Sequence, residues 1–160
     1  TLEEKVDIVQ NAIELAHIMG VPEPKVAILA AVETVTPKMR ATLDAAALCK
    51  MADRKQIRGG LLDGPLAFDN AVSIVAARTK GITSVVAGQA DILLVPDIES
   101  GNMLAKQLEY LANALSAGIV LGAKVPVVLT SRADTAVTRA ASCAIAAMIA
   151  HARRKSPVVA

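Results

Sequence analysis

Apolar runs with the composition of buried strands alternate along this chain with segments of helical periodicity. Three of these runs, at residues 25–32, 91–95 and 125–129, are rich in valine, isoleucine and leucine, and each lies between two helical segments. Strands joined through a helix run parallel in one sheet, because the helix carries the chain back to the edge where the previous strand began. The alternation therefore predicts an α/β fold in three layers, with helices on both faces of a largely parallel sheet.

Helical periodicity is clearest in the first half of the chain. Residues 2–19 place apolar side chains at spacings of three and four, which predicts an amphipathic helix. Residues 37–54 predict a second helix that buries Leu43 and Met51. A chain of 160 residues is long enough for one domain with a real core, so residues 1–160 are interpreted as a single α/β unit.

The composition excludes several classes of partner. Hydrophobic residues make up 54% of the chain but aromatic residues only 1%, so the core is expected to be aliphatic, and stacking along a nucleic acid has no support. The net charge of +2 is too small for a nucleic-acid footprint. The most apolar run, residues 140–150, is shorter than the ~18 residues that a transmembrane helix needs. We therefore expect neither a nucleic-acid partner nor a membrane.

Cysteine and histidine indicate no metal or redox centre. Cys49 and Cys143 stand alone in apolar, helical contexts, which is typical of reduced core thiols in a cytoplasmic protein. His17 and His151 are also solitary on helices and are interpreted as structural. The sequence contains no metal-ligand spacing, Walker motif or GxGxxG motif, so metals, nucleoside triphosphates and NAD have no support as cofactors.

The distinctive polar residues gather at three corners where a predicted strand passes into a helix. These corners lie at residues 62–69, 95–102 and 129–135. In a parallel sheet the carboxyl ends of the strands share one edge, and open α/β sheets bind ligands at that edge. We therefore expect the three corners to meet around one site.

The third corner places Thr130, Ser131, Arg132 and Asp134 just before the last predicted helix, 135–153. Ser131 and Asp134 have the spacing of a capping box, which alone would account for both residues. It does not account for Arg132, because a cation in the first helical turn faces the positive end of the dipole and costs roughly 0.3–1 kcal/mol if exposed. The planar fork of arginine matches phosphate. The corner is therefore a candidate site for phosphate or an acyl phosphate.

The other two corners carry turn and capping residues. At the first, Asp63, Gly64 and Pro65 predict a sharp turn after a brief strand, where a ligand can approach the glycine backbone closely. An ordinary turn would explain the same residues. At the second, Asp97 follows a strand end and precedes a helix predicted from Met103. Its other polar residues either cap this helix or line a site: Glu99, Ser100, Gly101 and Asn102.

Three motifs, one at each corner, resemble the phosphate acetyl/butyryltransferase family: Asp63-Gly-Pro-Leu-Ala-Phe-Asp-Asn-Ala-Val-Ser, Val95-Pro-Asp-Ile-Glu-Ser-Gly-Asn-Met and Pro126-Val-Val-Leu-Thr-Ser-Arg-Ala-Asp. The resemblance covers essentially the whole chain. It is nearest to the butyryltransferase-like branch, which includes the phosphotransacetylase part of bifunctional enoyl-CoA hydratase/phosphate acetyltransferases. Family members extend further at the N-terminus, so the resemblance implies a C-terminal portion.

The resemblance also implies an architecture. The family has a two-domain α/β fold similar to the isocitrate and isopropylmalate dehydrogenases, usually dimeric, with the active site in the cleft between domains. In this chain the last helix, 135–153, would then pack against an N-terminal domain. A homodimer is the assembly that the resemblance implies.

The activity that the resemblance implies is reversible transfer of an acetyl or butyryl group between coenzyme A and inorganic phosphate. No metal or other cofactor is implied, because coenzyme A is itself a substrate. Arg132 would bind the phosphoryl group, and Ser131 would donate a hydrogen bond to the developing oxyanion. A family carboxylate takes the thiol proton; in the acetyltransferase branch it falls nearer Thr138, and Asp134 is the local acid here. The residues assigned to lining the cleft are Thr130, Asp63, Gly64, Pro65, Asp97, Glu99, Gly101 and Asn102.

Two other functions stay open on the sequence. The chain is alternatively a catalytically incomplete fragment that binds coenzyme A or forms a dimer but lacks the other wall of the cleft. A hydroxyacid dehydrogenase of the related fold is a further alternative, but the sequence has no recognisable set of metal-binding aspartates.

Overall fold

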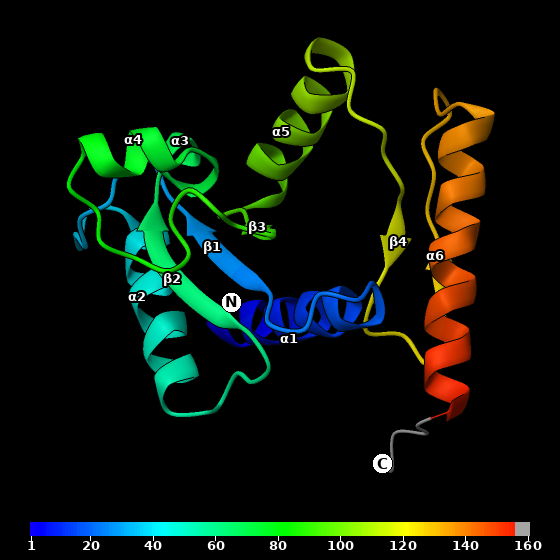
Figure 1. The fold of residues 1–160 in the computed structure, drawn as a ribbon, viewed down its shortest axis with the longest axis horizontal. Helices are drawn as coiled ribbons and strands as arrows, with labels where there is room; N and C mark the ends of the chain where they lie inside the picture. Colours follow the sequence, from blue (N-terminus) through cyan, green and yellow to red (C-terminus); the bar gives the residue numbers. More distant parts are fainter. Residues whose placement is uncertain (156–160) are drawn as a thin grey trace.

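The computed structural model describes residues 1–155, which form two parts joined by one helix (Figure 1). We call residues 1–97 the body and residues 118–155 the arm. The body contains α1 Leu2–Ile18, β1 Lys25–Leu29, α2 Arg40–Asp53, β2 Leu61–Leu66, α3 Phe68–Val72, α4 Ile74–Thr79 and β3 Ile92–Leu94. The joining helix is α5 Ile98–Leu111, and the arm contains β4 Ile119–Val120, β5 Val127–Val128 and α6 Ala136–Lys155.

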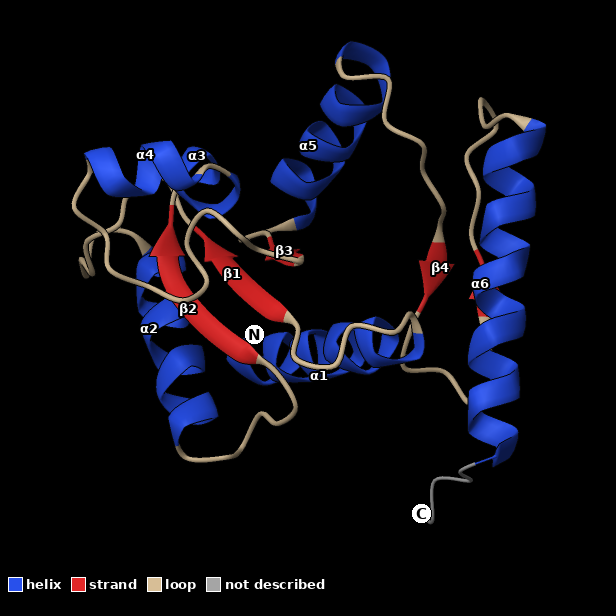
Figure 2. Ribbon diagram, in the orientation of Figure 1, coloured by secondary structure: helices blue, strands red, loops and turns tan. Residues whose placement is uncertain are grey.

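The body is built around β1, the central strand of a parallel sheet with the order β2-β1-β3 (Figure 2). Successive side chains of a strand point to opposite faces of its sheet. Val26 and Ile28 accordingly join the core beneath α1 and α2, whereas Ala27 and Leu29 join the core on the α3 and α4 side. The predicted α/β fold, with a parallel sheet covered on both faces, is therefore confirmed.

Both cores of the body are aliphatic, as the composition predicted. On one face, Val9 and Ile13 of α1 pack with Leu48 of α2, and all three side chains are fully buried. On the other face, Leu66 of β2 packs with Val86 of the loop before β3. Complete burial of one such side chain contributes roughly 1.5–3 kcal/mol, so these layers supply the main stabilisation of the body.

The predicted strand at 125–129 does not belong to this sheet. Only Val127 and Val128 are in strand conformation, and they pair antiparallel with Ile119 and Val120 in a separate two-stranded sheet. A short turn, not a helix, joins β4 to β5, and a short turn reverses the direction of the chain. The prediction that all three corners share one sheet edge is therefore wrong for the third corner.

Two predicted boundaries also shift. β2 continues through Asp63, Gly64 and Pro65 to Leu66, so these residues lie within a strand and not in a turn after it. α5 begins at Ile98, earlier than predicted, because the Asp97 side chain accepts a hydrogen bond from the Ser100 N–H and caps the helix there.

The arm is held together by contacts between its hairpin and α6. The Gly118 N–H donates to Ser142 Oγ at 3.0 Å, and the Leu129 N–H donates to the Gly118 carbonyl at 3.2 Å. Ser142 is completely buried, and its hydroxyl donates to the Thr138 carbonyl. A Cβ atom on Gly118 would lie 1.9 Å from the Leu129 carbonyl oxygen, so only glycine fits this close approach. α6 of the arm contacts α1 of the body.

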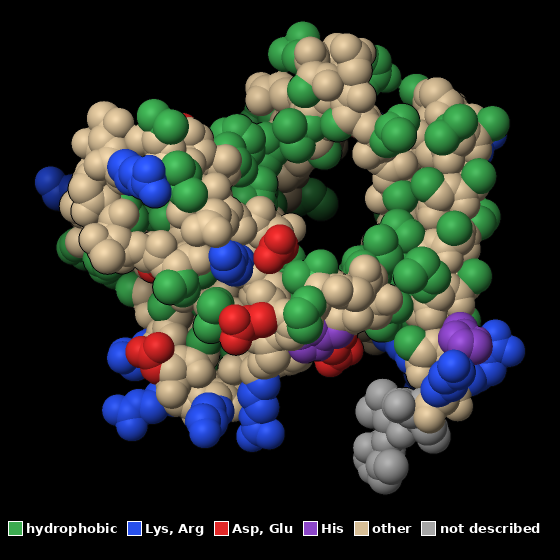
Figure 3. Space-filling model, viewed as in Figure 1, with side chains coloured by type: hydrophobic (Ala, Val, Ile, Leu, Met, Phe, Trp, Pro, Cys, Tyr) green, Lys and Arg blue, Asp and Glu red, His purple; other side chains and the backbone are tan. Residues whose placement is uncertain are grey.

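Apolar side chains on the arm and on α5 are far more exposed than those of the body. No residue of α5 is buried, and its Ile98 and Leu111 are each 81% exposed. Figure 3 shows an opening between the body and the arm, with apolar side chains along its rim. Within residues 1–155, no helix is both long enough and apolar enough to cross a bilayer.

Candidate functional site

The strand order β2-β1-β3 places a topological switch point between β1 and β3. From β1 the chain moves to one side to form β2, then crosses to the other side of β1 to form β3. Connections that leave a sheet in opposite directions open a crevice at the carboxyl ends of the strands, where open α/β folds bind ligands. The space beyond Leu29 and Leu94 is therefore where the fold itself favours a site.

A cavity of about 300 Å³ lies at this switch point. Its walls are residues 29–31 after β1, Val95 and Pro96 after β3, Phe68 of α3, and Ser100 and Leu104 of α5. The first and second corners of the sequence prediction thus meet across one cavity. We call it the switch-point cavity.

The polar residues of the second corner mainly shape the start of α5. Asp97 accepts hydrogen bonds from the Ser100 N–H at 2.8 Å and from the Ser100 hydroxyl at 2.6 Å. These two bonds hold the pKa of Asp97 below its usual range. Gly101 lies against Val95, and a Cβ there would approach the valine side chain to 2.9 Å. The capping alternative therefore explains Asp97, while Glu99 and Asn102 are exposed on the helix surface.

The predicted residues of the first corner serve the packing of β2. A Cβ on Gly64 would lie 2.7 Å from the Ile28 carbonyl oxygen, so the glycine allows β2 to lie close to β1. The Gly64 N–H donates to Asp63 Oδ1 at 2.8 Å. Asp63, Gly64 and Pro65 do not line the switch-point cavity; from this corner, Phe68 does.

The third corner is an exposed turn before α6. The Ser131 N–H donates to Asp134 Oδ2 at 2.7 Å, whereas the Ser131 hydroxyl accepts weakly from the Ala133 N–H at 3.4 Å. Thr135, not Ser131, caps α6, because its hydroxyl accepts from the Thr138 N–H. Arg132 is exposed and makes no side-chain hydrogen bond or ion pair within residues 1–155. It does not lie in the first helical turn, so the dipole argument for an anion beside it fails.

A second cavity, of about 240 Å³, lies between this corner and the end of α5. Asp134 and Thr138 line it from the arm, and Glu109 and Tyr110 line it from α5. Glu109 accepts a hydrogen bond from Lys106 at 2.6 Å, which holds the pKa of Glu109 below its usual range. The sequence prediction missed Glu109, since an acid near the end of an amphipathic helix carries no signal of its own. We call this space the α5–α6 cavity.

The family of the chain follows from its similarity to known proteins. A family model described as phosphate acetyl/butaryl transferase matches residues 1–147. The chain belongs to this family. It is 64% identical over 159 residues to a phosphate acetyltransferase of Rhizobium meliloti, with 99% of this chain and 50% of the relative covered. It is 53% identical over 149 residues to a phosphate butyryltransferase of Clostridium acetobutylicum, with 93% and 50% covered.

A solved relative has the same arrangement of elements. A branched-chain phosphotransacylase from Enterococcus faecalis superposes with a TM-score of 0.83 at 37% identity, over 94% of this chain and 54% of the relative. This chain therefore spans about half the length of the relatives that it matches. The superposition covers 94% of the chain, so it includes most of the arm as well as the body.

The family resemblance at the three corners does not gather them into one pocket of this chain. The switch-point cavity is lined by Ser100 and the α5–α6 cavity by Tyr110. At a rise of 1.5 Å per residue, these positions are about 15 Å apart along α5. Two corners thus adjoin one cavity, and of the residues assigned to catalysis only Asp134 lines the other.

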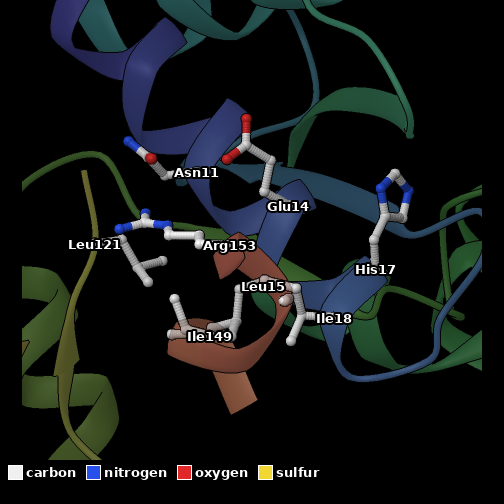
Figure 4. Close-up of a pocket in the computed structure, with 9 residues that line it drawn as sticks. Asn11, Glu14, Leu15, His17, Ile18, Leu121, Ile149 and Arg153 are labelled. Carbon is white, nitrogen blue, oxygen red and sulfur yellow. The ribbon is translucent and has the colours of Figure 1, made fainter. Parts of the chain in front are cut away.

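Other candidate groups lie away from both cavities. A further cavity, of about 430 Å³, lies between α1 and α6, where Leu15, Ile149 and Arg153 surround it (Figure 4). It adjoins the end of α1, on the side of the body opposite to the carboxyl edge of the sheet, because β1 begins soon after α1 ends. Burial raises the pKa of the Cys49 thiol to about 12, which leaves it unreactive. Within residues 1–155, no group of three or more His, Cys, Asp or Glu side chains is placed to hold a metal ion.

Proposed function

We propose that this chain forms the C-terminal part of a phosphate acyltransferase, which transfers an acetyl or butyryl group reversibly between coenzyme A and inorganic phosphate. The match of the family model to residues 1–147 carries this proposal. The similarity to both a named acetyltransferase and a named butyryltransferase supports the reaction type, and the proposal keeps both acetyl and butyryl as the transferred group. Acyl-CoA, coenzyme A and phosphate are the proposed substrates.

The chemistry requires a thiolate, a held phosphate and a stabilised oxyanion. A thiol with a pKa of about 8.5 is mostly protonated at neutral pH, so a carboxylate that takes its proton assists attack on the acyl carbonyl. As the C–S bond forms, the carbonyl oxygen becomes an oxyanion, and the C–O bond to phosphate then breaks. Hydrogen bonds that strengthen as this oxyanion develops supply a large part of the acceleration.

The residues of the third corner are assigned to these roles through the family resemblance. Arg132 binds the phosphoryl group through its planar guanidinium, and Ser131 donates its hydroxyl to the oxyanion. Asp134 is the local proton acceptor, and its carboxylate also holds the Ser131 N–H. Arg132 is exposed, which leaves its guanidinium accessible to a substrate anion. The second wall of the cleft would then come from elsewhere in the protein.

The exposed apolar surface of the arm supports a further part of the proposal. Leu129 is 65% exposed and Val137 60% exposed, on either side of the catalytic corner. Large contiguous apolar surfaces on soluble proteins mark interaction sites. We infer that a polypeptide segment equivalent to the N-terminal half of the relatives covers this surface and α6. A cytoplasmic homodimer is the proposed assembly.

A pair of arginine variants tests the assignment. Arg132→Ala is expected to lower the turnover of acyl phosphate with coenzyme A by about 100-fold or more, because one lost transition-state contact costs 10²–10³ in rate. Arg139→Ala is the matched control, since Arg139 is also exposed but lies on α6 beyond the corner. Circular dichroism verifies that both variants fold. Equal rates for the two variants would remove Arg132 from the site.

The alternative of a catalytically incomplete fragment is favoured by one observation, the exposure of Arg132 without a second wall beside it. On this alternative the isolated 160-residue chain binds coenzyme A but transfers no acyl group. Assaying the chain alone and a polypeptide that includes an N-terminal half like that of the relatives distinguishes the two. Activity of the longer polypeptide only would identify the chain as the incomplete part.

A further inference from the structure

The switch-point cavity has walls that the assigned catalytic residues do not use. Seven of its eight lining residues are apolar, and Ser100 is the exception. Phe68, the single phenylalanine of the sequence, stands in this wall at the first position of α3 and is 41% exposed. A large aromatic ring left open at the binding edge of an α/β sheet offers a stacking surface to a planar group.

Ser100 gives this surface one directional polar contact. Its hydroxyl donates to Asp97 Oδ1, with 2.6 Å between the two oxygen atoms. The hydroxyl oxygen keeps lone pairs, so it accepts a hydrogen bond from a donor inside the cavity. The cavity therefore suits a flat, largely apolar group that carries an N–H donor on its edge. An adenine ring with its exocyclic amino group has this chemistry.

The position of the cavity relative to the catalytic corner favours the same occupant. Along α5 the two cavities come nearest at Leu104 and Glu109, about 7.5 Å apart, and their far ends at Ser100 and Tyr110 are about 15 Å apart, so a two- or four-carbon acyl chain does not bridge them. Coenzyme A is long enough, because its thiol is separated from its adenine by a ribose, a diphosphate and a pantetheine arm. That arm alone matches an extended peptide of about four residues, or roughly 14 Å. Adenine at one end of α5 is thus compatible with a thiol at the other.

The α5–α6 and α1–α6 cavities fit adenine less well. The α5–α6 cavity is lined by the carboxylates of Glu109 and Asp134, which an apolar ring would desolvate at a cost. The α1–α6 cavity holds no Phe, Tyr or Trp side chain and lies on the far side of the body from the carboxyl edge of the sheet.

We infer that the switch-point cavity binds the adenine ring of coenzyme A, stacked on Phe68 and hydrogen-bonded to Ser100, with α5 setting the distance to the acyl-transfer corner. This inference rests on the proposed function for the identity of the nucleotide. Phe68 and Ser100 are then binding residues of the coenzyme and take no part in bond making.

Truncation of the coenzyme provides the test. In the complete acyltransferase, Phe68→Ala is expected to raise the KM for coenzyme A about tenfold with kcat unchanged, the usual range for loss of one base–aromatic stack. With pantetheine as the acyl acceptor, which lacks the nucleotide, the same variant is expected to keep the KM of the unaltered protein. Phe68→Leu retains apolar packing without a ring and should behave as Phe68→Ala. Val72→Ala, on the same helix and 45% exposed, is the matched control and should change neither value.

A binding measurement gives a readout that does not depend on turnover. Titration calorimetry with adenosine 3′,5′-bisphosphate should show weaker binding to Phe68→Ala than to the Val72→Ala control. Equal KM changes for coenzyme A and pantetheine, no change in either, or a shift in acetyl against butyryl preference would each overturn the inference. Absence of acyl transfer by the unaltered protein, with binding of the bisphosphate still dependent on Phe68, would reject the proposed function and retain the nucleotide site.

Discussion

The body and the arm use similar aliphatic sequences in opposite ways. In the body, Val26 and Leu48 are completely buried between a parallel sheet and its helices. In the arm, Val127 and Val128 are 42% and 37% exposed, although they occupy a strand of the same composition. Burial of apolar area is the main favourable term in folding, so the body gains more stabilisation from its own core than the arm does.

The difference shows which part of the chain leaves its apolar side chains exposed. The sheet of the body is covered on both faces, whereas the hairpin of the arm has only two strands and one covering helix, α6. An isolated two-stranded hairpin is marginal in water without such packing. The third corner, to which catalysis is assigned, lies in the arm. If the proposed N-terminal segment covers the arm, it also affects the geometry of this corner.

Removing a core side chain from the body should have the largest effect on stability. Leu48→Ala leaves a cavity where a fully buried leucine stood, and we expect the free energy of unfolding to fall by about 2–5 kcal/mol. Urea unfolding followed by circular dichroism measures this loss. Leu115→Ala, at a residue 88% exposed just before the arm, is the control and should change stability by no more than ~0.5 kcal/mol. Equal losses would erase the distinction between the two regions.

A clash introduced into the arm should act locally. Gly118→Ala sets a methyl group 1.9 Å from the Leu129 carbonyl oxygen, and we expect a loss of about 1–3 kcal/mol as the hairpin shifts. Hydrogen exchange should accelerate at the amides of β4, β5 and the first turns of α6. Gly81→Ala, at a body-loop glycine with open space around it but a φ of +68°, is the control for backbone strain confined to the body, and it should not accelerate exchange in the arm. Faster exchange in β1 would contradict the independence of the body.

Much of the body could be predicted from sequence because its pattern is local. The run containing Val26 and Ile28 is continuous, β-branched and flanked by helical periodicity, which is typical of a central parallel strand. The second helix was less well predicted: Leu43 is 38% exposed, and the polar Thr42 and Asp44 are buried. Alanine-rich helices lack a strong apolar stripe, so hydrogen bonds from Thr42 and ion pairs from Asp44 decide which face turns inward.

The candidate site was only partly predictable, for physical reasons that differ between corners. The run at 125–129 has the same local pattern as β1, and only the missing crossover helix makes its pairing antiparallel. Gly64 carried the signal of close backbone approach, but the neighbour is Ile28 and not a ligand. Glu109 and Phe68 line cavities because of where α5 and α3 lie in three dimensions, which no short motif records.

An ion-pair cluster at the carboxyl edge of the body should give it a pH dependence that the arm lacks. Burial by itself would raise the pKa of Asp44, but hydrogen bonds from Lys5 and Arg40 hold it below its usual range. A depressed folded-state pKa stabilises the protein above the unfolded value of about 3.9, and this stability is lost as the pH falls through the folded pKa.

Asp44→Asn is therefore expected to lower the free energy of unfolding at pH 7 by about 1–2 kcal/mol. This is the low end for hydrogen bonds to charged groups, because the Arg40 side chain is 74% exposed and solvent screens its charge. Urea titrations should show that the difference in the free energy of unfolding between the variant and the unaltered chain narrows as the pH falls below 4. Asp53→Asn, which removes an exposed partner of Lys50, is the control and should leave the pH profile nearly unchanged. A gap that stays constant from pH 7 to acid would show that charge at Asp44 is not the cause.

The smallest expected effect on stability comes from the exposed thiol of the arm. The prediction of a core thiol is wrong for Cys143, which is exposed on α6. Cys143→Ala should therefore change the free energy of unfolding by no more than ~0.5 kcal/mol. The same residue reports on the arm through its reactivity, since a thiol-specific reagent should modify Cys143 quickly and Cys49, whose pKa is about 12, only after unfolding. In a polypeptide that includes an N-terminal half like that of the relatives, the rate at Cys143 should fall if that half covers α6. An unchanged rate there would place the covering surface on the hairpin and α5 instead, because those are the remaining exposed apolar surfaces beside the third corner.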